Sequence, residues 1–72
     1  MLDAETIRNA VDKLSEPLRT VVALHYFEDF SLLEIADILS LPLGTVKFRL
    51  HRARKELAAA LAQTIIGKTA SN

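Results

Sequence analysis

The chain contains no cysteine, which excludes disulfide bonds and thiolate metal sites and fits a reducing compartment. It has only two glycines and two prolines, so we expect helices joined by short connections. No apolar run approaches the roughly 20 residues that span a bilayer, and no signal-peptide pattern stands at the start. The 72 residues therefore predict one small cytoplasmic domain without membrane association.

The net charge is zero, but the charges are distributed unevenly along the chain. Residues 1–41 carry eight acidic side chains and three basic ones, whereas residues 42–72 carry six basic side chains and one acidic one. A positive segment of this kind either forms a solvated helix face or meets a polyanion. Charge alone does not decide between these two interpretations.

Capping residues predict where the first two helices begin. Asp3 can cap a first helix over about residues 4–14. Ser15 supplies a capping hydroxyl for a second helix, and Pro17 lies in its first turn, where a missing N–H costs nothing. We expect this second helix to end near Asp29.

Two further helices follow in the second half of the chain. Residues 31–34 (SLLE) have the form of a capping box and predict a short helix over about residues 32–39. Pro42 ends that segment, because the residue before proline is disfavoured in the helical conformation. A fourth helix is expected over about residues 43–66, with Gly67 as its stop.

These elements predict an all-α fold, a four-helix bundle over residues 1–67 followed by a disordered tail at residues 68–72. Each helix carries apolar residues at spacings of three and four, which form the stripe that faces a core. The stripes consist, in chain order, of Ile7, Ala10, Val11 and Leu14; Leu18, Val21, Val22, Leu24 and Tyr26 or Phe27; Ile35, Ala36, Ile38 and Leu39; and Val46, Leu50, Ala53, Leu57 and Leu61.

The third and fourth helices, with the turn between them, form a helix-turn-helix over about residues 31–57. The turn position that often carries glycine is Ser40. Five cations lie within residues 47–55, and like charges at this density repel one another unless a polyanion compensates them. DNA phosphates supply that compensation through counterion release. At the start of the helix, Gly44 and Thr45 are expected to leave backbone N–H groups free for a phosphate.

At this point the sequence resembles a known family, region 4 of bacterial sigma-70-type factors, and most closely the extracytoplasmic-function (ECF) group. The resemblance covers about residues 5–62. It rests on residues 14–19 (LSEPLR), 27–31 (FEDFS), 34–36 (EIA) and above all 42–54 (PLGTVKFRLHRAR). It implies a winged-helix-like, four-helical domain that docks on the flap of the RNA polymerase β subunit and reads the minus-35 element of double-stranded promoter DNA.

The resemblance also assigns roles to single residues. It implies contacts to base edges from Lys47, Phe48, His51 and Arg52. It implies phosphate contacts from Thr45, Arg49, Arg54 and Lys55, in addition to the phosphate contact expected from Gly44. The guanidinium of Arg52 suits guanine O6 and N7. Phe48 departs from the small polar residue common in the family, and it either packs on a thymine methyl or contacts a protein partner.

A complete ECF factor also has region 2, which binds the polymerase clamp and melts the minus-10 element. Nothing in this chain corresponds to region 2. We therefore expect either an excised part of a longer protein or a natural stand-alone domain, and in both cases no transcription initiation by the domain alone.

Apolar residues outside the core are candidates for contact with polymerase or with an anti-sigma factor. Leu32 and Leu33 cannot both face inward beside Ile35, so one of them is expected to be exposed. The candidate partner-binding residues are Leu32, Leu33, Tyr26 and Phe27.

Two other functions remain open. One is a stand-alone LuxR-type regulator, which binds a palindrome as a dimer. The other is a sigma-like protein-interaction domain that binds an anti-sigma factor. The sequence has no nucleophile with its base and no phosphate-cradling glycine loop, so we expect no enzyme and no small-molecule substrate. His25 and His51 lie too far apart to suggest a metal, and no cofactor is expected.

Overall fold

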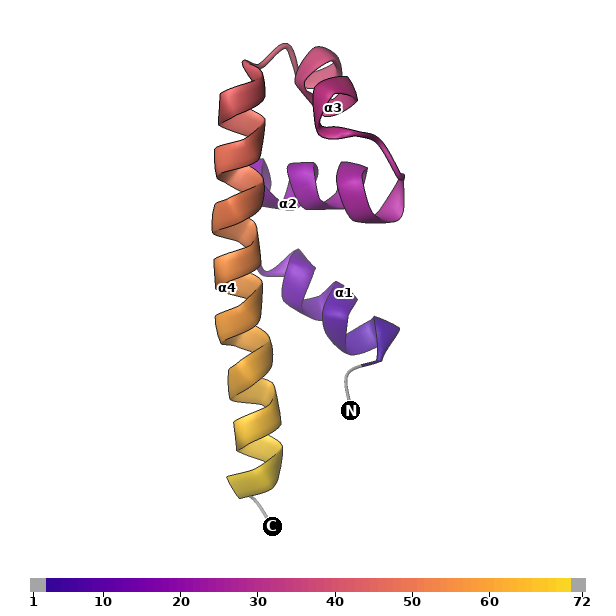
Figure 1. Cartoon of the computed structure of the whole chain (residues 1–72). Helices are drawn as coiled ribbons and strands as arrows, with labels where there is room; N and C mark the ends of the chain where they lie inside the picture. Colours follow the sequence, from indigo (N-terminus) through magenta and orange to yellow (C-terminus); the bar gives the residue numbers. More distant parts are fainter. Residues whose placement is uncertain (1–2, 71–72) are drawn as a thin grey trace.

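Three short helices lie along one side of a long helix, α4 (Leu43–Ala70) (Figure 1). The computed structural model describes the backbone of residues 3–70 and the side chains of residues 3–63. No strand occurs in the described backbone, so the predicted all-α fold is confirmed. The short helices are α1 (Ala4–Asp12), α2 (Glu16–Val22), which continues into the π-helical turn η1 (Ala23–Phe27), and α3 (Leu32–Leu39).

The helix ends agree with prediction where a local signal determines them. Helix α3 covers residues 32–39, as predicted. The second helix ends in the wider η1 turn, and Asp29 follows in the left-handed conformation with φ 61°. Helix α4 was predicted to stop at Gly67, but its backbone continues to Ala70. A single glycine costs a helix only about 1 kcal/mol relative to alanine, which is too little to end it.

Two of the three predicted caps form. The Thr6 N–H donates to Asp3 Oδ1 at 2.8 Å, which satisfies an amide at the start of α1. At α3 the capping box is complete, since the Glu34 N–H donates to Ser31 Oγ at 3.1 Å and the Ser31 N–H donates to Glu34 Oε1 at 2.8 Å. The Ser31 N–H that donates to this carboxylate, with a second contribution from the Ser31 side chain, lowers the pKa of the Glu34 carboxyl below its ordinary value.

The third predicted cap is wrong, because the Ser15 side chain makes no capping hydrogen bond at α2. An N-cap oxygen normally accepts from the second or third helical N–H. Here the second position is Pro17, which has no N–H, so one of the two eligible donors is missing.

The core lies between the three short helices and the first half of α4. Its fully buried side chains come from α2, α3 and α4, and α1 adds Ala10 and Val11. Burying an aliphatic side chain contributes about 1.5–3 kcal/mol, so this cluster holds the elements together. The four largest fully buried side chains are Val21, Val22, Ile35 and Val46.

Three predicted core positions lie at the surface. Neither Tyr26, 47 % exposed, nor Phe27, 39 % exposed, packs in the core, although one of the two was expected to, because the wider π-helical turn η1 breaks the 3.6-residue period on which that expectation rested. Ile38 is 51 % exposed, because the buried stripe of α3 runs through positions 32, 35, 36 and 39 and leaves Ile38 outside it. Ile7 is 37 % exposed, because α1 approaches α4 only at its C-terminal end and Ile7 lies in the half that diverges from it (Figure 1).

Candidate nucleic-acid interface

A tight left-handed turn joins α3 to α4. Ser40 has φ 55° and ψ 46°, a conformation that glycine adopts most easily. The Leu41 N–H donates to Ala36 O at 2.9 Å, and the Ser40 N–H donates to Asp37 O at 3.2 Å. This pair of bonds is a Schellman motif, which satisfies the last carbonyls of α3. Ser40 therefore forms the same turn that glycine usually forms at this position.

The start of α4 differs from prediction at one amide. The Thr45 N–H was expected to be free for a phosphate, but it donates to Pro42 O at 3.0 Å, because the proline carbonyl precedes the first turn of the helix and accepts from it. The Thr45 side chain is half-buried. Gly44 remains available, since its N–H has no acceptor among the described residues and open space surrounds the position of a side chain there.

Helix α4 separates a buried stripe from an exposed surface. Val46, Leu50 and Ala53 are at most 2 % exposed, and Leu57 packs against the same core. The opposite surface carries the exposed residues that we call the basic face: Lys47, Phe48, His51, Arg52 and Lys55. Four of these, all except Lys47, line one shallow hollow together with Glu56.

Phe48 is 61 % exposed within the basic face. It also lines a second hollow, where α4 meets Ser15, Pro17 and Leu18 at the start of α2. Most of this aromatic side chain is exposed among cations and it is not part of the described core, so it is available to an external partner.

Arg49 lies beside the basic face. Its side chain is half-buried and lines a hollow with Glu16 and Pro17 from α2 and with Leu39 and Leu41 from the turn region. Packing of its aliphatic stem there leaves a guanidinium at the edge of the surface.

Arg54 faces away from the hollow that holds Arg52. Its Nε donates to Tyr26 Oη at 2.7 Å, and its Cζ lies 5.7 Å from the centre of the Tyr26 ring. The structure thus brings a predicted phosphate-binding residue together with a predicted partner-binding residue. Arg54 does not line the hollows that Arg52 and Phe48 share, although it follows His51 by three residues on the same helix.

Glu56 is a member of the site that the sequence interpretation did not assign. Its Oε2 lies 3.3 Å from Arg52 Nε, which donates to it. The spacing of four residues on one helix is the signal that predicts such a pair.

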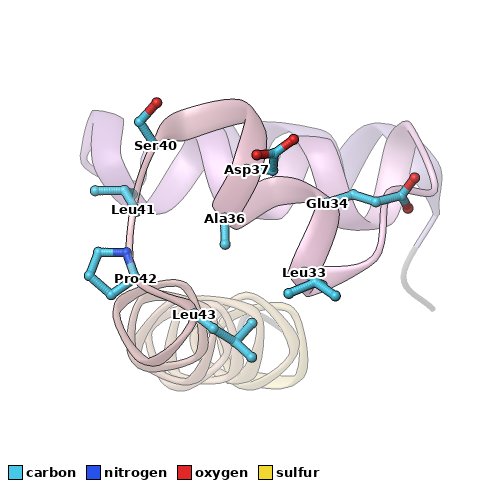
Figure 2. A pocket seen from close by; sticks show the side chains of 8 residues that line it. All are labelled: Leu33, Glu34, Ala36, Asp37, Ser40, Leu41, Pro42 and Leu43. Atoms are coloured by element: carbon cyan, nitrogen blue, oxygen red, sulfur yellow. The ribbon is translucent and has the colours of Figure 1, made fainter.

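The candidate partner-binding residues lie in separate places. Leu33 is 68 % exposed and Leu32 packs against the core, so the expectation that one of the two is exposed is confirmed. Figure 2 shows Leu33 beside Leu43 in a hollow at the junction of α3 and α4. Phe27 lines another hollow, between α1 and α2, where the guanidinium carbon of Arg8 lies 4.5 Å from its ring centre.

Within the described residues, no group of histidine, cysteine, aspartate and glutamate could hold a metal ion. No described helix is long and apolar enough to cross a membrane.

Comparison with known proteins gives consistent matches. The family profile described as "Sigma-70, region 4" matches residues 4–57. The chain is 46 % identical over 54 residues to the "ECF RNA polymerase sigma factor SigW" of Bacillus subtilis, an alignment that covers 75 % of this chain and 29 % of that protein. It is 39 % identical over 56 residues to the "RNA polymerase sigma-H factor" of Pseudomonas aeruginosa, with 78 % and 29 % covered.

A third relative is the "ECF RNA polymerase sigma-E factor" of Haemophilus influenzae, 38 % identical over 58 residues, with 76 % of this chain and 31 % of that protein covered. The chain thus spans less than a third of the length of each of these relatives.

Proposed function

The chain belongs to the sigma-70 region 4 family, and from that premise we propose that it binds the minus-35 element of promoter DNA as region 4 of an ECF-type sigma factor. This family is non-enzymatic, so its function rests on binding. The proposed role is to position RNA polymerase at a promoter during transcription initiation, in the cytoplasm. Promoter DNA and RNA polymerase are the two proposed partners of this small domain.

One observation carries the proposal, namely the basic face of α4. The major groove admits an α-helix and displays a distinct donor and acceptor pattern for each base pair. Helix α4 holds its buried stripe in the core and leaves the opposite surface free, so that surface can enter a groove without unfolding anything. We assign base contacts to Lys47, Phe48, His51 and Arg52.

Phosphate contacts belong to the edges of this surface. Gly44 offers an open amide at the start of α4, where the helix dipole also favours an anion. Lys55 lies within the basic face, while Arg49 and Thr45 lie on the side toward α2. Arg54 takes a phosphate on the other side, where Tyr26 holds it.

The protein partner is proposed to be the flap of the polymerase β subunit, and an anti-sigma factor is a second partner for the same apolar residues. Exposed apolar side chains away from the basic face support this assignment. Leu33, Tyr26 and Phe27 are exposed, and Leu32 is partly buried against the core.

The test is a selection of random double-stranded oligonucleotides by the 72-residue chain, followed by titration of the enriched sequence at several salt concentrations. We expect a short asymmetric motif, bound as a monomer with an affinity that falls steeply with salt. A palindromic motif bound by a dimer would contradict the sigma assignment and support the LuxR-type regulator. No enrichment even at low salt would support the protein-interaction domain.

A further inference from the structure

Glu56 is the one acidic residue in the basic half of the chain, residues 42–72. It lies one helical turn after Arg52, and its carboxylate accepts from Arg52 Nε at 3.3 Å. Both side chains are solvent-accessible, with 63 % of Arg52 and 45 % of Glu56 exposed. Glu56 also lines the hollows that contain Phe48. The acid therefore stands within the surface that is proposed to meet DNA.

Stability does not account for this acid. An exposed ion pair within one helix contributes little to folding. The order is also the less favourable one, since a glutamate stabilises a helix more when it precedes its cation than when it follows it. A carboxylate on this surface in addition repels DNA phosphates. A surface that served affinity alone would not carry Glu56.

The geometry of the pair suggests what the acid does. Glu56 engages only the Nε of Arg52, and no described group accepts from the two terminal nitrogens of that guanidinium. Those two nitrogens form the fork that donates to guanine O6 and N7 together. Arg52 can thus contact a base edge while its pair with Glu56 stays intact.

We propose that Glu56 is a specificity-determining residue that holds Arg52 in its base-reading orientation and withholds it from the phosphate backbone. On non-specific DNA, a phosphate that lies outside the direction in which Glu56 holds these two nitrogens is reached only when Arg52 leaves Glu56, which then faces the phosphates unpaired. On the specific site no such loss occurs. Glu56 therefore weakens binding to wrong sequences more than binding to the right one. This inference rests on the proposed DNA-binding function.

The test measures dissociation constants for the selected duplex and for a scrambled duplex. Glu56→Ala should raise affinity for scrambled DNA about tenfold and for the selected site about threefold or less, so the ratio of the two affinities falls. The salt dependence on scrambled DNA should steepen by about one released ion, since Arg52 becomes free to neutralise a phosphate.

Three companion variants separate orientation from charge. Glu5→Ala removes an exposed acid from α1 and should change both affinities by the same factor. Glu56→Gln keeps an acceptor oxygen and should retain more of the affinity ratio than Glu56→Ala. In an Arg52→Ala background, Glu56→Ala should raise both affinities equally, because no guanidinium remains to be oriented.

Two results overturn the inference in different ways. If the wild-type chain prefers the selected duplex and Glu56→Ala raises both affinities by one factor, Glu56 acts only through its charge and this proposal is wrong. If the wild-type chain shows no preference at all, the proposed function fails as well, and this is seen before any variant is made.

Discussion

Arg54 and Tyr26 are joined across the fold, with Arg54 Nε donating to Tyr26 Oη at 2.7 Å although 28 residues separate them in the chain. The His25 ring packs edge-on against Tyr26 at a centroid distance of 4.8 Å, and His25 Nδ1 lies 2.9 Å from Phe30 O. The π-helical turn η1 is thereby fastened to the helix that carries the basic face.

Tyr26→Phe should lower the free energy of unfolding by about 0.5–1 kcal/mol, because it removes the acceptor of Arg54 and keeps the ring. Urea denaturation followed by circular dichroism measures the change. The matched test is a double-mutant cycle with Arg54→Ala, in which the two losses should not add. Fully additive losses would mean that the hydrogen bond contributes nothing.

Ser40→Gly should raise the free energy of unfolding by about 0.5–1 kcal/mol, because it relieves the strain of a β-carbon in the left-handed conformation at φ 55°. This gain exceeds the extra chain entropy that glycine loses on folding. Ser40→Ala is the control, because alanine keeps the β-carbon that causes the strain and should not stabilise the domain. Thermal and urea denaturation of both variants test this. Equal stabilisation by alanine and glycine would contradict the explanation.

The capping box makes the stability depend on pH through Glu34. Its pKa in the folded chain is lowered, so the ionised carboxylate stabilises the fold fully above the ordinary pKa of glutamate, and this contribution is lost as pH falls through the lowered pKa. The stability difference between the wild type and Glu34→Gln should therefore shrink on acidification. Other groups titrate in both proteins and cancel in this difference. A difference that stays constant from neutral to acidic pH would refute the mechanism.

Arg52→Ala should cost about 1–3 kcal/mol on the selected site and relax discrimination there, because a base contact is lost. Lys55→Ala should weaken binding to all sequences alike and reduce the salt slope by about one. Titration of both variants on selected and scrambled duplexes compares the two roles. Equal losses on the two duplexes for Arg52→Ala would remove it from the base readers.

The parts of the fold that the sequence predicted correctly are those that local signals determine. The Asp3 cap and the capping box over residues 31–34 depend on neighbours three residues apart, and both form where the sequence predicts them. Ile7 and Ile38 were misplaced because their burial depends on how α1 and α3 lie against the rest of the domain. Helical periodicity identifies the apolar stripe of a helix, but it does not show which end of that stripe packs against a neighbouring helix.

The candidate site also combines features that local sequence patterns determine with features that depend on how the helices pack. The buried stripe of Val46, Leu50 and Ala53 follows from spacing alone, and it leaves the opposite surface to the cations. The bond from Arg54 to Tyr26 depends on the wider turn of η1, for which no local pattern in the sequence is diagnostic. The Arg52–Glu56 pair was within reach of prediction, because the spacing of four residues is visible in the sequence.

The basic face and the core stripe occupy the same turns of one uninterrupted helix, α4. Rotation of this helix about its own axis would draw Val46 and Ala53 out of the core, so the backbone of the DNA-facing surface cannot adjust independently. A change in the angle at which this surface meets a groove requires the entire domain to tilt. Tolerance for different groove widths then comes from the many rotamers of long arginine and lysine side chains, while the scaffold beneath them keeps one shape.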